Sequence, residues 1–285
     1  MSQKRVAVVT GANKGIGFGV VKKLCANFNG IVYLTARDVG RGTKAQQDLA
    51  KFGLTAQFHQ LDLDDMNSID TFADYIRTTH GGLDVLVNNA AVTYKEFAEQ
   101  AEPTLRVNYF GMKYLCHKLF PILRANARVV NLSSDDGHLT RVNGDEPFAS
   151  KLREKLASTD LTEDELTQMV VTFIKCAKDG SYKTKGWPCS SYRMSKVAAC
   201  ALTRIQQRRC DQEPRLNILV NAVHPGYVAT DATSHLGHMT IEEGAMAASY
   251  LALLPAGVCE PRGALVWHDK QVVDWINGPL PGDGY

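Results

Sequence analysis

One glycine-rich turn constrains this chain more than any other feature. Residues 10–17 read TGANKGIG and stand between an uninterrupted apolar run over 6–9, typical of a fully buried strand, and apolar residues at helical spacing over 16–28. In a strand–turn–helix context the first glycine allows a tight turn, the second lets a pyrophosphate approach the backbone, and the third lets the helix pack closely, while the helix N-terminus offers N–H donors. The turn therefore predicts a dinucleotide-binding site, with a plain glycine-rich connection as the alternative. The expected contacts are Gly11, Asn13, Lys14, Gly15, Ile16 and Gly17.

Strand-like and helix-like segments alternate along most of the chain. Apolar runs predict strands at 6–9, 31–34, 57–61, 83–87, 128–132, 216–222 and 264–267. Helical periodicity predicts helices at 16–28, 42–52, 67–79, 105–123, 192–209 and 241–253. This order predicts βαβ units and hence an α/β fold, a doubly wound parallel seven-stranded Rossmann sheet in a single domain over 1–285.

Residues 135–187 break this alternation. Thr162 is placed to cap a helix, Glu165 three positions later completes a capping box, and Gly180 ends the apolar periodicity. We therefore expect an ordered helical insertion over 135–187 rather than a linker.

Composition argues against several classes of function. A formal net charge of +2 gives no strong field for nucleic acid or an anionic membrane surface, and no apolar run approaches the roughly 18 residues of a membrane span. The seven cysteines lack metal-ligand spacing, so no metal site is predicted. The first residues show no signal-peptide pattern, which together with scattered cysteines favours the cytoplasm. Cys189, close to residue 192, is the first candidate for a reactive thiol.

Further motifs follow the turn in a fixed order. They are Asn88-Asn-Ala-Ala91 after the fourth strand, Asn108 in the next helix, Ser133-Ser134 after the fifth strand, Tyr192 with Lys196 on a helix, and Pro225-Gly226 after the sixth strand. Alone, each would be an ordinary turn or helix face. In this order they resemble the short-chain dehydrogenase/reductase family over about residues 5–270. Ala91 departs from the family, which usually has glycine there.

The resemblance implies a catalytic set of Asn108, Ser134, Tyr192 and Lys196. Lys196 follows Tyr192 by about one helical turn, so both side chains share a face. A free phenol has a pKa of about 10, and a nearby ammonium is expected to lower it. Tyr192 would protonate the carbonyl oxygen as hydride arrives, Ser134 would hydrogen-bond that oxygen, and Asn108 would hold a water that relays protons to Lys196.

The residues after the second strand favour NADP(H) as the cofactor. Enzymes that use NAD generally place an acid there for the ribose 2′-OH, and this chain has Ala36. Lys14, Arg37 and Arg41 can surround a 2′-phosphate instead. Asp38 is counter-evidence unless it serves as a helix-entry residue. The resemblance adds cofactor contacts at Asp62, Leu63, Asn88, Tyr192, Lys196, Pro225, Gly226, Val228 and Thr230.

The insertion between Ser134 and Tyr192, with GWP at 186–188, is similar to that of the cytosolic carbonyl reductases of animals. This similarity implies NADPH-dependent reduction of small-molecule aldehydes, ketones and quinones. It also implies a monomer, because the insertion would cover the helix face through which relatives dimerise. The implied substrate contacts are Ser134, Tyr192, Tyr94, Lys95, Gln100, Trp187 and Tyr227.

Several alternatives stay open. A core role is about as favoured for Trp187 and Tyr227 as a substrate contact, and the short 92–108 loop leaves a glutathione site undecided. The chain could instead oxidise a specific steroid or retinoid alcohol, or act as a non-enzymatic NADPH-binding partner of another protein.

Overall fold

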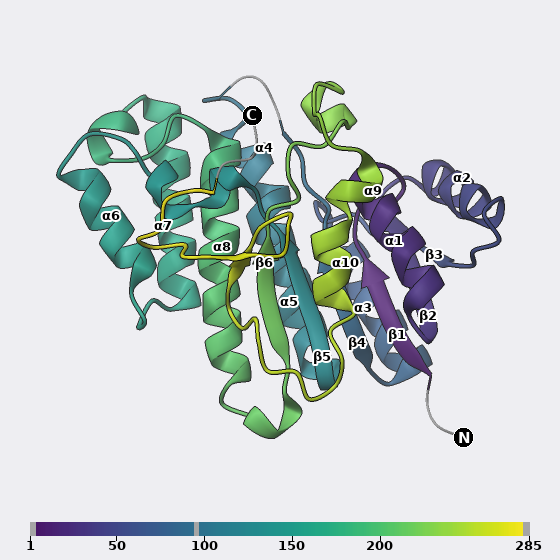
Figure 1. The fold of residues 1–285 in the computed structure, drawn as a ribbon. Coiled ribbons are helices and arrows are strands. Elements are labelled where there is room, and N and C mark those ends of the chain that lie inside the picture. Colours follow the sequence, from purple (N-terminus) through teal and green to yellow (C-terminus); the bar gives the residue numbers. More distant parts are fainter. Residues whose placement is uncertain (1–3, 94–96, 282–285) are drawn as a thin grey trace.

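The computed structural model describes residues 4–93 and 97–281, which form one sheet covered by helices (Figure 1). The sheet has eight strands in the order β3-β2-β1-β4-β5-β6-β7-β8. Their bounds are β1 Arg5–Val9, β2 Gly30–Ala36, β3 Gln57–Gln60, β4 Leu83–Asn88, β5 Leu123–Leu132, β6 Leu219–Val223, β7 Leu265–Val266 and β8 Val272–Val273. The first seven pair in parallel, as predicted, and β8 adds an antiparallel edge. The sequence does not predict β8, because two residues carry no readable alternation.

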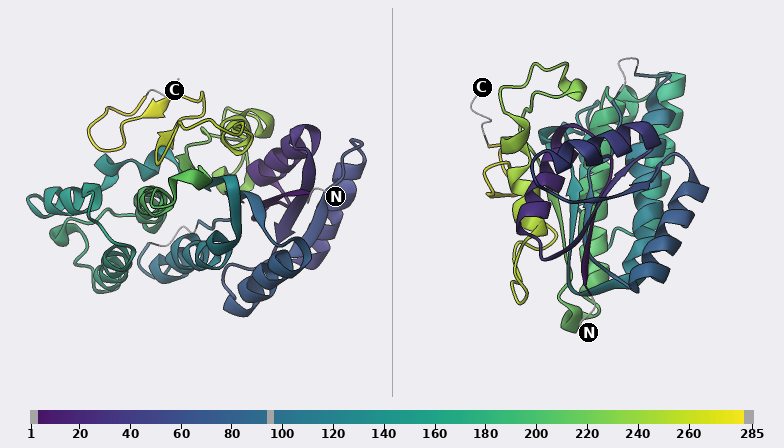
Figure 2. Two further views of the ribbon diagram at one scale, coloured as in Figure 1. Left: turned by 90° about the horizontal axis from the view of Figure 1, so that it is seen from below. Right: turned by 90° about the vertical axis from the view of Figure 1, so that its right-hand side faces the viewer.

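Helices cover both faces of the sheet, as the doubly wound prediction requires (Figure 2). Their bounds are α1 Gly15–Asn27, α2 Val39–Ala50, α3 Met66–His80, α4 Ala101–Leu105, α5 Met112–Leu119, α6 Phe148–Ala157, α7 Glu163–Asp179, α8 Ser191–Cys210, α9 Ile241–Gly244 and α10 Met246–Ala252. One apolar core joins α1, α2 and α10 to the sheet, and a larger core joins α3, α5 and α8 to the other face. The strands are therefore buried on both sides, which explains their continuous apolar runs.

The strand order reverses between β1 and β4. In open parallel sheets a crevice forms at such a switch point, beyond the carboxyl ends of the strands. The turn at 10–17 leaves β1 at this point, residues 89–93 leave β4, and Ser133 and Ser134 leave β5. The topology therefore brings the predicted cofactor and catalytic residues to one edge of the sheet.

The predicted helix over 105–123 is divided in the structure. It consists of α4, a π-helical stretch at Arg106–Gly111, α5 and a 3-10 turn at Phe120–Ile122. Asn108 lies inside the π-helical stretch, and such stretches recur at functional sites. A side chain at Gly111 would meet the Leu63 carbonyl oxygen at 2.1 Å, so the helix passes very close to the segment that follows β3.

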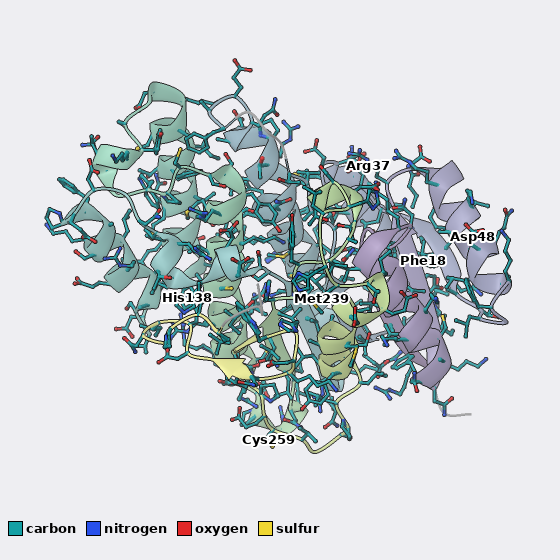
Figure 3. The ribbon with its side chains drawn as sticks, turned by 45° about the horizontal axis from the view of Figure 1, so that its top comes forward. Phe18, Arg37, Asp48, His138, Met239 and Cys259 are labelled. Atoms are coloured by element: carbon teal, nitrogen blue, oxygen red, sulfur yellow. The ribbon has the colours of Figure 1, made fainter. Side chains whose placement is uncertain are left out.

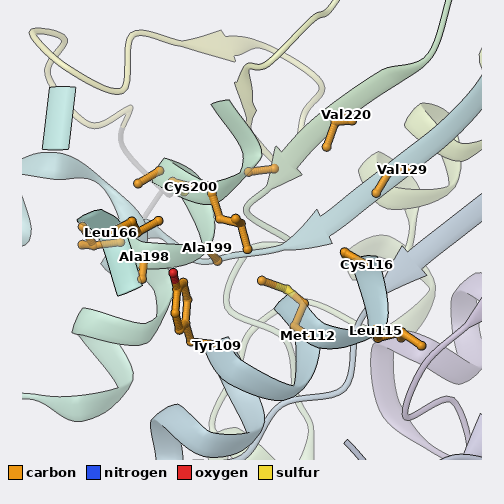
Figure 4. Packing of buried hydrophobic residues seen from close by; sticks show 14 of the residues in the cluster. Tyr109, Met112, Leu115, Cys116, Val129, Leu166, Ala198, Ala199, Cys200 and Val220 are labelled. Atoms are coloured by element: carbon orange, nitrogen blue, oxygen red, sulfur yellow. The ribbon is translucent and has the colours of Figure 1, made fainter. Parts of the chain in front are cut away.

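The insertion forms two helices, α6 and α7. The capping box of α7 is present: Thr162 Oγ1 accepts from the Glu165 backbone N–H at 3.2 Å, and the Glu165 carboxylate accepts from the Thr162 N–H at 2.9 Å. Gly180 ends α7 with a φ of 80°. Leu166 belongs to the same apolar cluster as Tyr109 and Ala198 of α8 (Figure 4). The insertion is thus packed on the Rossmann core.

The segment after β8 is fastened to the turn that follows β5. Trp275 Nε1 donates to the Gly137 carbonyl at 2.7 Å, and His138 Nε2 bonds the Asp274 carbonyl at 3.0 Å. Figure 3 shows His138 beside this C-terminal segment, drawn in yellow. Within the described ranges, no helix has the length and apolar character needed to span a membrane.

Candidate active site

A cavity of about 640 Å³ opens at the carboxyl edge of the sheet. Its wall combines the phosphate turn, the residues after β2, β3 and β4, part of α8 and the loop after β6. The predicted residues that line it are Gly11, Asn13, Lys14, Gly15, Ile16, Arg37, Arg41, Asp62, Leu63, Tyr192, Lys196, Pro225 and Thr230.

The phosphate turn requires glycine at two positions for steric reasons. Gly11 has a φ of 59°, and a Cβ there would lie 2.8 Å from Ala90 Cα. A Cβ at Gly17 would lie 2.3 Å from the Asn89 amide nitrogen, so Gly17 mainly clears Asn89 rather than letting α1 approach β1. No side chain caps the N-terminus of α1, so among the described residues its first N–H groups have no side-chain acceptor there. An anion in the cavity can therefore take these donors.

The neighbours Asn88 and Asn89 have different surroundings. Asn88 was expected to contact the cofactor, but it is buried and donates to Asn131 Oδ1 at 2.8 Å. Asn89 lines the cavity instead, and its amide donates to the carbonyls of Thr10 and Gly11 at 2.8 and 3.0 Å. Asn89 thus holds the turn in place. Side chains of adjacent strand residues point to opposite faces, so the sequence pair alone did not tell which asparagine enters the site.

The cations predicted for a 2′-phosphate gather at the cavity wall after β2, where Figure 3 labels Arg37. Asp38 does not oppose them as a ribose ligand, because it caps α2: its carboxylate accepts from the Arg41 N–H at 2.7 Å, and this bond holds the pKa of Asp38 low. Lys14 forms an ion pair with Asp231, which also accepts from His235 at 3.0 Å. The loop at 229–235 therefore contributes to the cavity wall, and except for Thr230 the sequence patterns did not indicate it.

Tyr192 and Lys196 share one face of α8, with the Lys196 ammonium 5.3 Å from the Tyr192 ring centre. Lys196 Nζ donates to the Leu132 carbonyl at 2.8 Å, and burial lowers the pKa of Lys196 to about 8. Burial raises the pKa of the Tyr192 phenol, the carboxylates of Asp136 and Asp135 raise it further, and a hydrogen bond with Ser134 acts against them. In the chain alone, burial and the two carboxylates therefore outweigh the lowering of this pKa that is expected from Lys196. Tyr192 is protonated at neutral pH, which is the state a proton donor needs.

The two serines after β5 differ in their contacts. Ser133 is buried and its hydroxyl donates to the Lys196 carbonyl at 3.1 Å, so it is a structural link to α8 although it touches the cavity wall. Ser134 is half-buried and lies outside that wall; its hydroxyl donates to Asp135 Oδ1 at 2.8 Å and accepts from the Asp136 N–H at 3.2 Å. Ser134 reaches Tyr192, whereas Ser133 faces α8.

Asn108 has a different contact set from the one expected. Its amide nitrogen donates to the Val92 carbonyl at 2.9 Å and to Ser195 Oγ at 3.1 Å, and its oxygen accepts from the Val92 N–H at 2.8 Å. The side-chain amide is thus occupied by protein partners, and the water that the resemblance implies at Asn108 stays a prediction. It fixes the loop after β4 against α8.

The remaining predicted residues lie away from the cavity wall. Trp187 is buried with its ring 5.9 Å from Phe173, so its core role holds and its substrate role is corrected. Val228 is buried beside Gly244, and a Cβ at Gly226 would meet Met239, so both shape the loop. Other predicted residues outside the wall are Gly17, Gln100, which precedes α4, and Tyr227, whose ring lies 6.2 Å from His238. Tyr94 and Lys95 fall outside the described residues.

The cysteines form neither disulfides nor a metal site among the described residues. All seven cysteines are free, and in the described ranges no cluster of His, Cys, Asp or Glu could hold a metal ion. Cys189 is exposed, with its sulfur 3.2 Å from the Tyr182 hydroxyl. It lies in the segment leading into α8.

Comparison with known proteins identifies the family. The model of the short chain dehydrogenase family matches residues 5–178, which is more than half of the chain. The chain belongs to the short-chain dehydrogenase family. As a member, it is 45% identical over 280 residues to human carbonyl reductase (NADPH) 3, covering 96% of this chain and 99% of that protein. It is 42% identical to bovine carbonyl reductase (NADPH) 1 with the same coverage.

Solved structures of the family give the same fold. Salutaridine reductase from Papaver somniferum superposes with a TM-score of 0.81 at 33% identity, covering 92% of this chain and 99% of that one. Menthone neomenthol reductase from Mentha piperita gives a TM-score of 0.77 at 30% identity, covering 93% and 99%. The short-chain dehydrogenase fold therefore extends over nearly the whole chain, beyond the residues matched by the family model.

Proposed function

We propose that this chain is an NADPH-dependent carbonyl reductase that converts aldehydes, ketones and quinones to alcohols or hydroquinones. The observation that carries the proposal is the layout of one cavity. Lys14, Arg37 and Arg41 line it near β1 and β2, and Tyr192 and Lys196 line it beside β5. Three strand spacings, about 14 Å, separate β2 from β5. A dinucleotide can therefore place its phosphates among the cations and its reactive ring beside Tyr192.

The residues present fit NADP(H). The positive φ of Gly11 and its contact with Ala90 keep the turn free of side chains, so a pyrophosphate can approach the N-terminus of α1. Arg37 and Arg41 offer guanidinium groups for a 2′-phosphate, and Ala36 presents no acid to compete. When bound, NADPH supplies the hydride that reduces the carbonyl carbon.

The chain's own residues handle the proton. Tyr192 donates its phenol proton to the carbonyl oxygen, and Ser134 hydrogen-bonds that oxygen as negative charge grows on it. Below pH of about 8 the Lys196 ammonium is charged and stabilises the phenolate left on Tyr192. Asn108 acts as a positioning residue, because it holds Val92 and Ser195 against each other.

The test is NADPH consumption with menadione or isatin. Tyr192→Phe should lose about 10² to 10⁴-fold in kcat while still binding NADPH. The phenylalanine ring fills the same space as the tyrosine ring but has no hydroxyl proton to donate. Tyr114→Phe is the matched control, since the Tyr114 hydroxyl bonds Asp70 on the surface of α3. Full activity in Tyr192→Phe would refute the mechanism. Saturable NADPH binding without turnover of any carbonyl by the wild type would favour a non-enzymatic role.

We further propose that the protein works as a monomer in the cytoplasm. α7 lies against α8, with Leu166 and Phe173 buried, and so covers one face of that helix. Free cysteines suit a reducing compartment. Light scattering coupled to gel filtration tests the first point, and fractionation of cells the second.

A further inference from the structure

The hydroxyl of Ser134 already has two hydrogen-bond partners in the segment that follows β5. It donates its one proton to Asp135 Oδ1 at 2.8 Å and accepts the Asp136 N–H at 3.2 Å. A hydroxyl has a single donor. Ser134 can therefore donate to a substrate oxygen only after its hydroxyl has rotated and broken the hydrogen bond to Asp135.

Asp135 is held as an ionised acceptor. Its second oxygen accepts from Arg141 Nη2 at 2.8 Å, and its backbone N–H donates to His224 Nδ1 at 2.9 Å. Burial acts to raise the pKa of Asp135, but the Ser134 hydrogen bond, the Arg141 charge and the Asp136 backbone N–H together lower it. Hydrogen bonds to a carboxylate are stronger than those between neutral groups. Freeing Ser134 without giving Asp135 another donor is therefore costly.

Asp135 has room for such a donor. Its side chain is 30% exposed, and a carboxylate has about four acceptor positions, of which Ser134, Arg141 and the Asp136 N–H take three. A carbonyl oxygen bonded to Ser134 would lie within two hydrogen-bond lengths, about 5–6 Å, of Asp135 Oδ1. A donor on the carbon next to the carbonyl can span this gap.

We propose that Asp135 selects α-hydroxy carbonyl compounds as preferred substrates, an inference that rests on the carbonyl reductase function proposed above. The substrate hydroxyl takes the place of Ser134 on Asp135, and the released Ser134 proton turns to the carbonyl oxygen. No bond to carbon changes in this exchange; hydride and the Tyr192 proton then complete the reduction. A substrate without the hydroxyl must break the Ser134–Asp135 bond uncompensated.

The local charge balance favours a neutral hydroxyl over an ammonium group. Asp136 is paired with Arg193 at 2.8 Å and lies 3.9 Å from Arg141, which also pairs with Asp135. The two carboxylates are thus matched by two guanidinium groups. The local field gives a cationic substrate little extra attraction, so the contact is selected by its hydrogen bond.

The first experiment uses the wild-type protein and three ketones: acetophenone, α-hydroxyacetophenone and α-methoxyacetophenone. The methoxy compound keeps the electron-withdrawing oxygen but has no donor. We expect kcat/KM with NADPH to be about tenfold or more higher for the hydroxy than for the methoxy ketone, the size of one charge-assisted hydrogen bond. Equal values for these two ketones would overturn the inference.

The second experiment applies the same ratio to Asp135→Asn and Asp136→Asn. Asp135→Asn should reduce the hydroxy-to-methoxy ratio severalfold, since a neutral amide accepts more weakly. Asp136→Asn is the matched control, because the Asp136 carboxylate binds arginines rather than Ser134, and the ratio should stay at the wild-type value. An unchanged ratio in Asp135→Asn, or equal losses in both variants, would contradict the assignment. If the wild type reduces no ketone or quinone, the proposed function itself fails, which is a distinct outcome.

Discussion

The buried ammonium of Lys196 predicts how the reductase rate depends on pH. Burial lowers the pKa of Lys196 to about 8, and the charged form stabilises the phenolate formed when Tyr192 gives up its proton. A group with a pKa near 8 is about nine-tenths charged at pH 7 and about one-tenth charged at pH 9. The charge is present below this pKa and lost above it. We therefore expect kcat for carbonyl reduction to fall close to tenfold between pH 7 and pH 9.

The assay is kcat at saturating NADPH and menadione across this range. Tyr192 does not produce the fall, because its own pKa is raised and the phenol stays protonated. Lys196→Arg should remove the fall, since a guanidinium stays charged in proteins, even if its absolute rate is lower. Lys151→Arg, at an exposed site on α6, should keep it. A basic limb near pH 8 that survives in Lys196→Arg would refute the reasoning.

Three further predictions concern the cofactor end, the turn and the insertion. Arg37→Ala should weaken NADPH binding about tenfold and NADH binding little, because a guanidinium can bind a 2′-phosphate bidentately; fluorescence titration decides it, and equal losses would count against a phosphate contact. Gly11→Ala should lower the free energy of unfolding by about 2–4 kcal/mol, from overpacking on Ala90 plus backbone strain. Gly53→Ala is the control, because Gly53 has a φ of 70° and no atom lies within 4 Å of the added Cβ; this variant should lose only the backbone strain, about 1 kcal/mol. Urea titrations compare the two variants, and similar losses in the free energy of unfolding would contradict the steric argument. Thr162→Ala should lower that free energy by about 1 kcal/mol with kcat unchanged, whereas a fall in kcat would tie the cap to the site.

Local patterns predicted what depends on local chemistry. The glycine turn, the capping box of α7 and the parallel strands follow from spacing that one segment carries by itself. The role of Asp38 as a helix-entry residue was also within reach, because a cap involves residues three positions apart.

Features that depend on packing between distant segments were not predictable. In the π-helical stretch, Asn108 hydrogen-bonds Val92 and Ser195. Gly111 in the same stretch lies so close to Leu63 that a side chain would not fit. Trp187 is a core residue because Phe173 of the insertion lies against it. The raised pKa of Tyr192 depends on burial and on carboxylates that follow β5, none of which the YxxxK spacing contains.

The fastening of Asp274 and Trp275 to the turn after β5 has a consequence for synthesis on the ribosome. Its hydrogen bonds join residues 136 and 138 positions apart, so the segment that carries Ser134 gains these bonds only after Trp275 has emerged. The phosphate turn and β1 to β4 are made much earlier and can pair before then. The phosphate turn can thus form early on a nascent chain, whereas the turn after Ser134 is fixed only when nearly the whole chain has emerged.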